Sequence, residues 1–243
     1  KVCLVLSDYL KRIKSLEPKY RYAVYGASTV AAGAVVYWLF SALAQARKVS
    51  LPMIPELSPG DPNFLQAKSY KPANRQRVDL VVLHSTENPV KPGIARNIAS
   101  WFAGDNAPQA SAHYVVGPDD IYQGVLEKDI SWAAPGVNDI AVNVEQVGQA
   151  LLTDWTSAGS GPNDGLAVLR NSAELVRSIC DRWKIPMERV DAQGLRAGKR
   201  GITTHASVTE AFKRSTHVDP GGSGDARWPW DTFLQLVRGE SIA

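Results

Sequence analysis

The clearest structural signal in the chain is the stretch VDLVVLH (78–84). Short apolar runs rich in β-branched residues are typical of strands that are buried on both faces, as in parallel sheets. This strand ends at His84, so we expect it to deliver an imidazole to one edge of a sheet. Before it the chain carries an apolar segment and a proline-rich stretch, and after it helix and strand patterns alternate.

The region after this strand predicts the fold class. One face of a helix over about 93–104 is formed by four apolar residues, Ile94, Ile98, Trp101 and Phe102. Interleaved elements predict an α/β fold, with a central mixed β-sheet flanked by helices. The further expected elements are a hairpin of AHYVVG (112–117) and IYQGV (121–125), a strand IAVNVEQVG (140–148), and helices at about 165–184, 206–214 and 229–238.

Residues 23–44 carry no charged side chain and are long enough for the roughly 20 residues that cross a bilayer. Basic residues are denser before this segment than after it, which predicts a cytoplasmic N-terminus and an external remainder. A buried hairpin or core helix is the alternative, and a cleaved signal peptide fits less well. We therefore expect an N-terminal segment (1–48) with a transmembrane helix, a Pro-rich linker (49–76) and a globular domain (77–243).

Composition excludes several classes of protein. The 243 residues are 44% hydrophobic and 21% charged, which is ordinary for a globular protein and excludes wholesale disorder. The net charge of +3 suits an anionic surface such as a bacterial wall but is too small for a nucleic-acid-binding protein. The two cysteines, Cys3 and Cys180, form neither a disulfide framework nor a Cys-x-x-Cys motif.

Three of the four histidines occupy positions that a hydrophobic core would not select. His84 ends a strand, His205 follows GITT, and His217 lies in STHVDPGG two residues before Asp219. Two imidazoles and a carboxylate are a known zinc-binding combination, with a fourth position left open. Spacing alone is a weak signal, because a single histidine is more often a hydrogen-bonded structural residue.

Five blocks in the chain give a more specific signal. Residues 78–231 resemble the zinc-dependent N-acetylmuramoyl-L-alanine amidases, the type-2 amidase family that is related to peptidoglycan recognition proteins and to amidase-type phage lysozymes. The resemblance leaves residues 1–76 uncovered. The blocks, in the order and approximate spacing of the family, are LVVLHST (80–86), SAHYVVGPDDIYQGV (111–125), NDIAVNVEQVG (138–148), ITTHASV (202–208) and HVDPGG with WPW (217–230).

The resemblance implies that Zn2+ is held by His84, His205 and Asp219, the last at a place where some relatives have cysteine. Such an ion lowers the pKa of a bound water to roughly 7 and polarises an amide carbonyl. Glu145 matches the acid that accepts the proton of that water. Without the resemblance, Glu145 reads equally well as a solvated strand residue.

The chain departs from the family pattern at two positions. His217 stands where many relatives carry a lysine that stabilises the oxyanion, and an imidazole, with a reference pKa of about 6.5, can donate to the same charge. A tyrosine of some relatives is Ala112 here, so no role passes to that position. Its neighbour His113 is expected to be a structural residue that supports the site.

A groove for a sugar–peptide chain is expected beside the metal. Stacking faces and amide donors suit muramyl-peptides, which makes Trp101, Trp132 and Asn138 candidates for its lining. Trp228 and Trp230 are expected to pack the C-terminal helix on the core. The segment TSAGSGPNDG (156–165) reads as a loop near the cleft.

The sequence therefore predicts a zinc amidase that hydrolyses the amide between N-acetylmuramic acid and L-alanine in bacterial peptidoglycan. We expect it to resemble a phage endolysin or a wall-remodelling hydrolase, anchored in the membrane with its catalytic domain at the cell wall. Two alternatives remain open: a peptidoglycan-binding module without activity, and a structural or delivery component of a virion or membrane complex.

Overall fold

The computed structural model describes residues 53–151, 155–156 and 165–242. The chain divides into two compact units, Lys1–Pro52 and Met53–Ala243, and the first lies outside the described residues. The transmembrane helix predicted at 23–44 therefore stays a prediction, as does most of the loop at 156–165. Within the described ranges, none of the helices has both the length and the apolar character needed to cross a bilayer.

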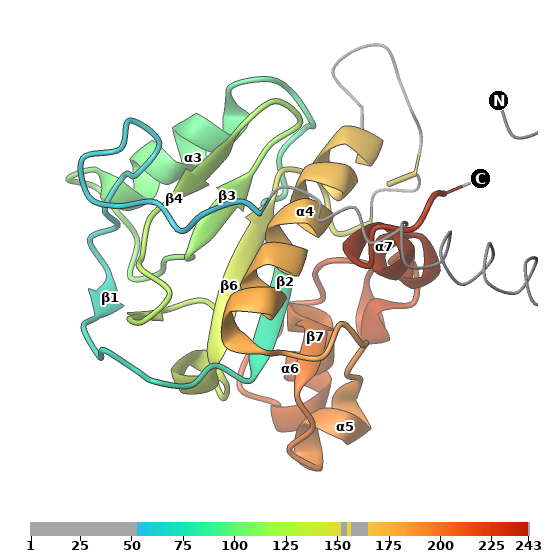
Figure 1. The fold of residues 1–243 in the computed structure, drawn as a ribbon. Helices are drawn as coiled ribbons and strands as arrows, with labels where there is room; N and C mark the ends of the chain where they lie inside the picture. The colour runs from blue at the N-terminus through green and yellow to red at the C-terminus, as the bar shows by residue number, and fades with distance from the viewer. Residues whose placement is uncertain (1–52, 152–154, 157–164, 243) are drawn as a thin grey trace, which may run out of the picture. The chain divides into compact units, whose positions relative to one another are not determined.

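A five-stranded sheet with the order β4-β3-β6-β2-β7 forms the centre of the second unit (Figure 1). β6 pairs with β2 and β3 in parallel, β7 pairs with β2 in parallel, and only β4 at one edge runs antiparallel, to β3. This confirms the predicted mixed sheet. The strands are β2 (Leu80–Ser85), β3 (Tyr114–Val116), β4 (Ile121–Gln123), β6 (Ala141–Gln146) and β7 (Gly201–Thr204).

Helices cover both faces of the sheet, because the strands are apolar on both sides. Val81 and Val142 belong to the large core cluster under α4 and α7, whereas Leu80 and Val82 pack with residues of α5 and α6. α4 crosses β6 and β2 in Figure 1. The helices are α3 (Ile94–Ala103), α4 (Gly165–Trp183), α5 (Ala192–Arg196), α6 (His205–Phe212) and α7 (Trp230–Val237), with short 3-10 turns at Asn138–Ile140 and Ser223–Asp225.

The C-terminal aromatic residues behave as predicted. Trp228 and Trp230 are buried, and their rings lie 5.6 and 6.5 Å from the ring of Phe233 in α7. Cys180 is likewise buried in α4 as a small core residue. The C-terminal helix is therefore fastened to the core by aromatic packing.

Residues 53–76 belong to the same compact unit as the sheet. Ile54 N–H donates to Ser178 Oγ of α4 at 2.9 Å, and Phe64 and Ala67 are buried. Within this stretch β1 (Tyr70–Lys71) pairs antiparallel with β5 (Ile130–Ser131). The proline-rich stretch thus runs along the domain and contributes to its core.

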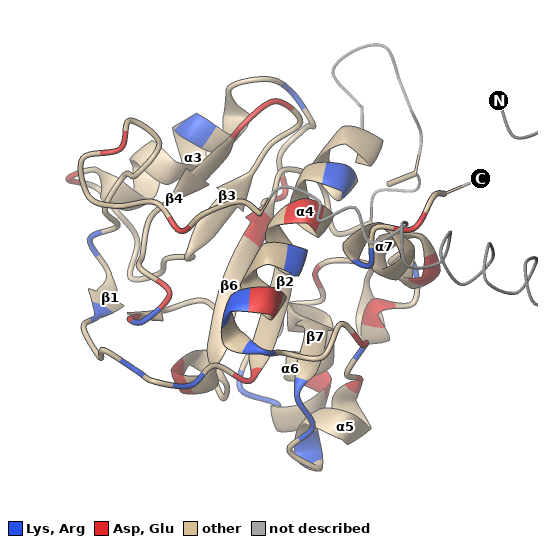
Figure 2. Ribbon diagram, viewed as in Figure 1, with Lys and Arg blue, Asp and Glu red and all other residues tan. Residues whose placement is uncertain are grey.

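The parallel register places chemically active residues at one end of the sheet. His84 of β2 lies opposite Glu145 of β6, and Leu83 lies opposite Thr204, the residue before His205. The strands are almost free of charged residues in Figure 2, and Glu145 is the one Asp, Glu, Lys or Arg among the five strands of the central sheet. Ligand sites of parallel sheets lie at the carboxyl ends of strands, so this end is where a site is expected.

Candidate metal centre and active site

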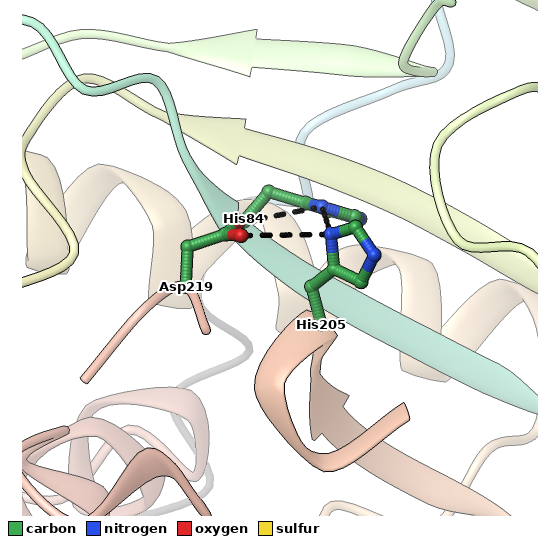
Figure 3. A group of neighbouring side chains, drawn as sticks. All are labelled: His84, His205 and Asp219. Carbon is green, nitrogen blue, oxygen red and sulfur yellow. Dashed lines mark hydrogen bonds and ion pairs between the residues drawn. The ribbon is translucent and has the colours of Figure 1, made fainter. Parts of the chain in front are cut away.

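Three side chains from distant parts of the chain converge at this end of the sheet. His84 comes from the end of β2, His205 from the first residue of α6, and Asp219 from the loop that follows α6 (Figure 3). One ligand atom of each lies within 4.8 Å of the others, and all three residues are buried. The structure thus brings together the three residues that the sequence assigns to a metal.

Hydrogen bonds on the far side of each imidazole orient the two rings. His84 Nε2 lies 3.0 Å from Asn143 Oδ1, and His205 Nε2 lies 3.1 Å from Ser215 Oγ. Both rings therefore turn Nδ1 toward the site, where the two Nδ1 atoms are 3.1 Å apart. With the ring protons on Nε2, two lone pairs face each other at that distance, and a cation between them and the carboxylate removes the repulsion.

The carboxylate of Asp219 completes the group. Its Oδ2 accepts a hydrogen bond from the backbone N–H of Ser85 at 3.1 Å, and its oxygens lie 3.6 Å from the Nδ1 atoms of His84 and His205. Because Ser85 follows His84 on the same strand, this bond joins the loop of Asp219 directly to β2.

A buried aspartate anchors the same loop against α6. Asp225 accepts hydrogen bonds from the hydroxyls of Thr204 (2.9 Å) and Ser207 (2.8 Å), and it pairs with the guanidinium of Arg189 at 2.5 Å. Thr204 immediately precedes His205 and caps α6 by accepting from Ser207 N–H. Asp225 therefore holds the Asp219 loop and the His205 helix in one fixed arrangement.

The electrostatic setting favours neutral imidazoles. Burial lowers the pKa of His84 to about 4, and burial together with the nearby His84 lowers the pKa of His205. A histidine binds a metal only in its neutral form, and two neutral imidazoles with one carboxylate and an open position suit Zn2+. The residues present therefore fit the metal that the family resemblance implies.

Glu145 lies near Asp219 and lines, with the three ligand residues, a cavity of about 670 Å3. Desolvation, followed by the negative charges of Asp219 and Glu87, raises its pKa to about 8. Glu87 is itself held in place, since its Oε1 accepts from the hydroxyl of Ser85 at 3.0 Å and from Ala150 N–H at 2.7 Å. A divalent cation nearby offsets both repulsions and favours the carboxylate form of Glu145.

His217 and two tryptophans also border this cavity. The imidazole of His217 is 64% exposed, stacks on His205 with ring centroids 4.6 Å apart, and has Nδ1 3.3 Å from Asp219 Oδ1. Trp101 is 52% exposed, with its ring stacked on Phe102, and Trp132 is 42% exposed, so both are accessible to a ligand. The predicted positions of these three residues agree with a groove beside the metal ligands.

Asn138 is not among the residues that line the cavity, and its assignment to the groove stays a prediction. Its Oδ1 accepts hydrogen bonds from the backbone N–H groups of Ala133 and Ala134, at 3.3 and 2.7 Å. The side-chain oxygen therefore shapes the turn that follows Trp132. Asparagine is frequent in such local side-chain-to-backbone bonds, which is the competing explanation for this residue type.

Sequence reasoning missed the residues that orient the imidazoles. Asn143 lies two residues before Glu145, and so on the same face of β6, which is a signal that the strand alternation already contained. Ser215 and Asp225 carry no such signal, because their partners are brought to them only by the folded loop.

Comparison with known proteins identifies the family. A family model described as N-acetylmuramoyl-L-alanine amidase matches residues 74–222. The chain belongs to the N-acetylmuramoyl-L-alanine amidase family. No protein of curated function matches the chain in sequence.

Several solved structures are similar to this chain. The hydrolase AmiA from Staphylococcus aureus, solved with its ligand, is 18% identical with a TM-score of 0.51, over 77% of this chain and 95% of AmiA. The PlyG catalytic domain is 18% identical with a TM-score of 0.49, over 74% of this chain and 95% of its own. PlyL is 20% identical with a TM-score of 0.45, over 73% and 89%. At these identities the likeness to AmiA concerns the fold alone.

Metal-free protein should lose stability on acidification below pH 6.5. The unfolded histidines titrate near 6.5, whereas burial lowers the pKa of His84 to about 4 and that of His113 to about 3. Between these values the unfolded state binds more protons, so the free energy of unfolding falls as the pH falls. Glu145 has the opposite effect between pH 4.5 and about 8. Its pKa is higher in the folded state than in the unfolded state, so its protonation raises the free energy of unfolding as the pH falls.

We expect a net decrease of roughly 1–3 kcal/mol per pH unit between about pH 6 and 4.5, measured by urea unfolding with a chelator present. Glu145→Gln removes the opposing contribution and should steepen the decrease. A free energy of unfolding that rises on acidification contradicts the buried neutral histidines.

Proposed function

We propose that this chain carries out zinc-dependent hydrolysis of the amide bond between N-acetylmuramic acid and L-alanine in bacterial peptidoglycan. The observation that carries the proposal is the meeting of His84, His205 and Asp219 within 4.8 Å, in a cavity that Glu145 also lines. The family of the chain supports the choice of substrate bond.

The metal is assigned to the two Nδ1 atoms and the Asp219 carboxylate. A Zn2+ ion bound there would act as a Lewis acid, which polarises the amide carbonyl of the substrate and lowers the pKa of water at the site. Asn143 and Ser215 hold the two rings from behind, and Ser85 N–H holds the carboxylate. The protein therefore presents the ligands already oriented.

Glu145 transfers the proton. Its carboxylate accepts a proton from the attacking water and then returns it to the nitrogen of the leaving alanine, so the C–N bond breaks to an amine and a carboxylic acid. The raised pKa keeps this carboxyl close to the range in which it can both accept and donate near neutral pH. Its pairing opposite His84 on the neighbouring strand holds it beside the metal ligands.

His217 is the proposed donor to the carbonyl oxygen as negative charge develops there. Its exposed ring projects into the cavity and is steadied by stacking on His205. Preorganised donors to an oxyanion act strongly because they need no reorganisation during the reaction. Trp101 and Trp132 offer ring faces on which sugar and peptide groups can pack.

Digestion of purified peptidoglycan tests the reaction. The zinc-loaded protein should release L-alanine amino ends that mass spectrometry identifies, and a chelator should abolish the release. His84→Ala should lose zinc and turnover together, whereas Glu145→Gln should keep zinc and lose about 10²–10⁴-fold in rate. A zinc-loaded Glu145→Gln variant with near-normal turnover contradicts its role, and wild-type protein that binds peptidoglycan without cleavage supports the binding-module alternative.

His217→Lys tests the oxyanion assignment. A lysine keeps its proton to higher pH than an imidazole does, so the variant should stay active and show a weaker decline of kcat at alkaline pH. The measurement is the pH profile of turnover for both proteins, with zinc content determined at each pH. Identical profiles show that His217 is not the donor.

We also propose that the protein acts at the cell wall as an endolysin-like enzyme, anchored through residues 23–44. The support is the uncharged character of this segment and the denser basic residues before it. The full chain should fractionate with membranes, and a variant lacking residues 23–44 should appear in the soluble fraction with its amidase activity retained. If the two proteins distribute equally between the membrane and soluble fractions, residues 23–44 are not a membrane anchor.

A further inference from the structure

A network of hydrogen-bonded, buried polar side chains extends from His84 into the interior, away from the cavity. It consists of Asn143, Ser131 and His113, each of which is 0% exposed. None of the three lines the cavity, so none contacts substrate there. Each buried polar atom must still find a partner, and the pattern of donors and acceptors is therefore constrained.

One peptide group decides which members of this network donate and which accept. The backbone N–H of Asn143 points at His113 Nδ1 over 2.9 Å, and an amide nitrogen can only donate. His113 Nδ1 must therefore accept, which leaves the ring proton on Nε2, 3.2 Å from the carbonyl oxygen of Asp129. Arg75 Nη2 lies 3.1 Å from the same Nε2, and because both nitrogens carry protons this contact is not a hydrogen bond. Burial and the Arg75 guanidinium keep this ring neutral, lowering its pKa to about 3.

The two hydrogen bonds of Ser131 follow from the acceptor role of His113 Nδ1. Ser131 Oγ lies 2.9 Å from His113 Nδ1, and because that nitrogen carries no proton, the serine hydroxyl donates to it. Ser131 Oγ then accepts from Asn143 Nδ2, also at 2.9 Å. The amide of Asn143 is thereby fixed with its nitrogen toward Ser131 and its oxygen toward His84.

The last link reaches the metal ligand. Asn143 Oδ1 lies 3.0 Å from His84 Nε2 and can only accept, so the proton of His84 resides on Nε2. Nδ1 is left with a free lone pair directed at His205 Nδ1 and Asp219. If the amide were reversed, its NH2 group would face Nε2 and drive the proton to Nδ1, where it would block a metal.

We propose that Asn143 is a positioning residue that holds His84 in the Nε2–H tautomer, and that Ser131 and His113 fix the orientation of its amide. Only the metal-binding part of this proposal rests on the proposed zinc amidase function. The tautomer itself is a property of the metal-free protein and is measurable without substrate or zinc.

Nuclear magnetic resonance of the metal-free protein tests the first step. Two-bond correlations between ring protons and 15N-labelled histidine nitrogens distinguish the two neutral tautomers. We expect His84 and His113 both to carry their proton on Nε2 in the wild type. A proton on Nδ1 of His84 overturns the proposal whatever the activity of the protein.

Zinc affinity, measured by competition with a chromogenic chelator, tests the second step. Asn143→Leu removes the acceptor and should weaken zinc binding by about 10–100-fold, the usual effect of losing such a partner of a metal-binding histidine. Asn143→Asp keeps an acceptor toward Nε2 and should restore binding. Ser131→Ala, which frees the amide to turn, should weaken binding less than Asn143→Leu and carries the test if the leucine variant fails to fold.

Asn171→Leu is the matched control. Asn171 is a half-buried asparagine of α4 that donates to the carbonyls of Gly117 and Pro118, at 2.9 and 3.1 Å, away from the metal ligands. This change should lower stability and leave zinc affinity unaltered. Equal zinc affinity of Asn143→Leu and wild type refutes the positioning role, whereas a wild type that binds zinc but cleaves nothing refutes the proposed function instead.

Discussion

Parallel pairing of β2 with β6 and β7 is the constraint on which the site depends. It sets His84 opposite Glu145 on one side and next to the start of α6 on the other. Since successive side chains of a strand point to opposite faces, a slip of one residue would send Glu145 into the core under α4 and α7. The apolar residues of both faces therefore fix the register, and with it the distance between the metal ligands and the proton acceptor.

The periodicity of the sequence predicted most of the architecture but not β7 and α5, which have only four and five residues. Each predicted strand and helix between 78 and 238 corresponds to one in the described residues, because apolar alternation and helical spacing reflect burial directly. His84 could be placed at a strand end for the same reason, whereas the role of Glu145 came from the family resemblance, because its strand position alone fits a solvated residue equally well. The turn-shaping bonds of Asn138 and the role of Ser215 were missed, because both depend on hydrogen-bond partners in loops whose path the sequence pattern does not encode.

Burial and catalysis make opposing demands on the same groups. Desolvation favours the neutral forms of His84 and Glu145, which suits a metal ligand but works against an ionised proton acceptor. A divalent cation reconciles the two, since it uses the neutral imidazole and stabilises the nearby carboxylate. The hydrogen bonds of Asn143, Ser215 and Asp225 connect the ligand residues to the surrounding fold and orient them.

The separation of the ligands along the chain has a mechanical consequence. His84 and His205 are 121 residues apart, so an ion bound to both ties the first strand of the sheet to its last as a crosslink does. Closing a long loop in this way removes conformational freedom from the unfolded chain, and a longer loop gives a larger effect in principle. A metal held by both residues therefore stabilises the folded domain, in addition to its part in the proposed reaction.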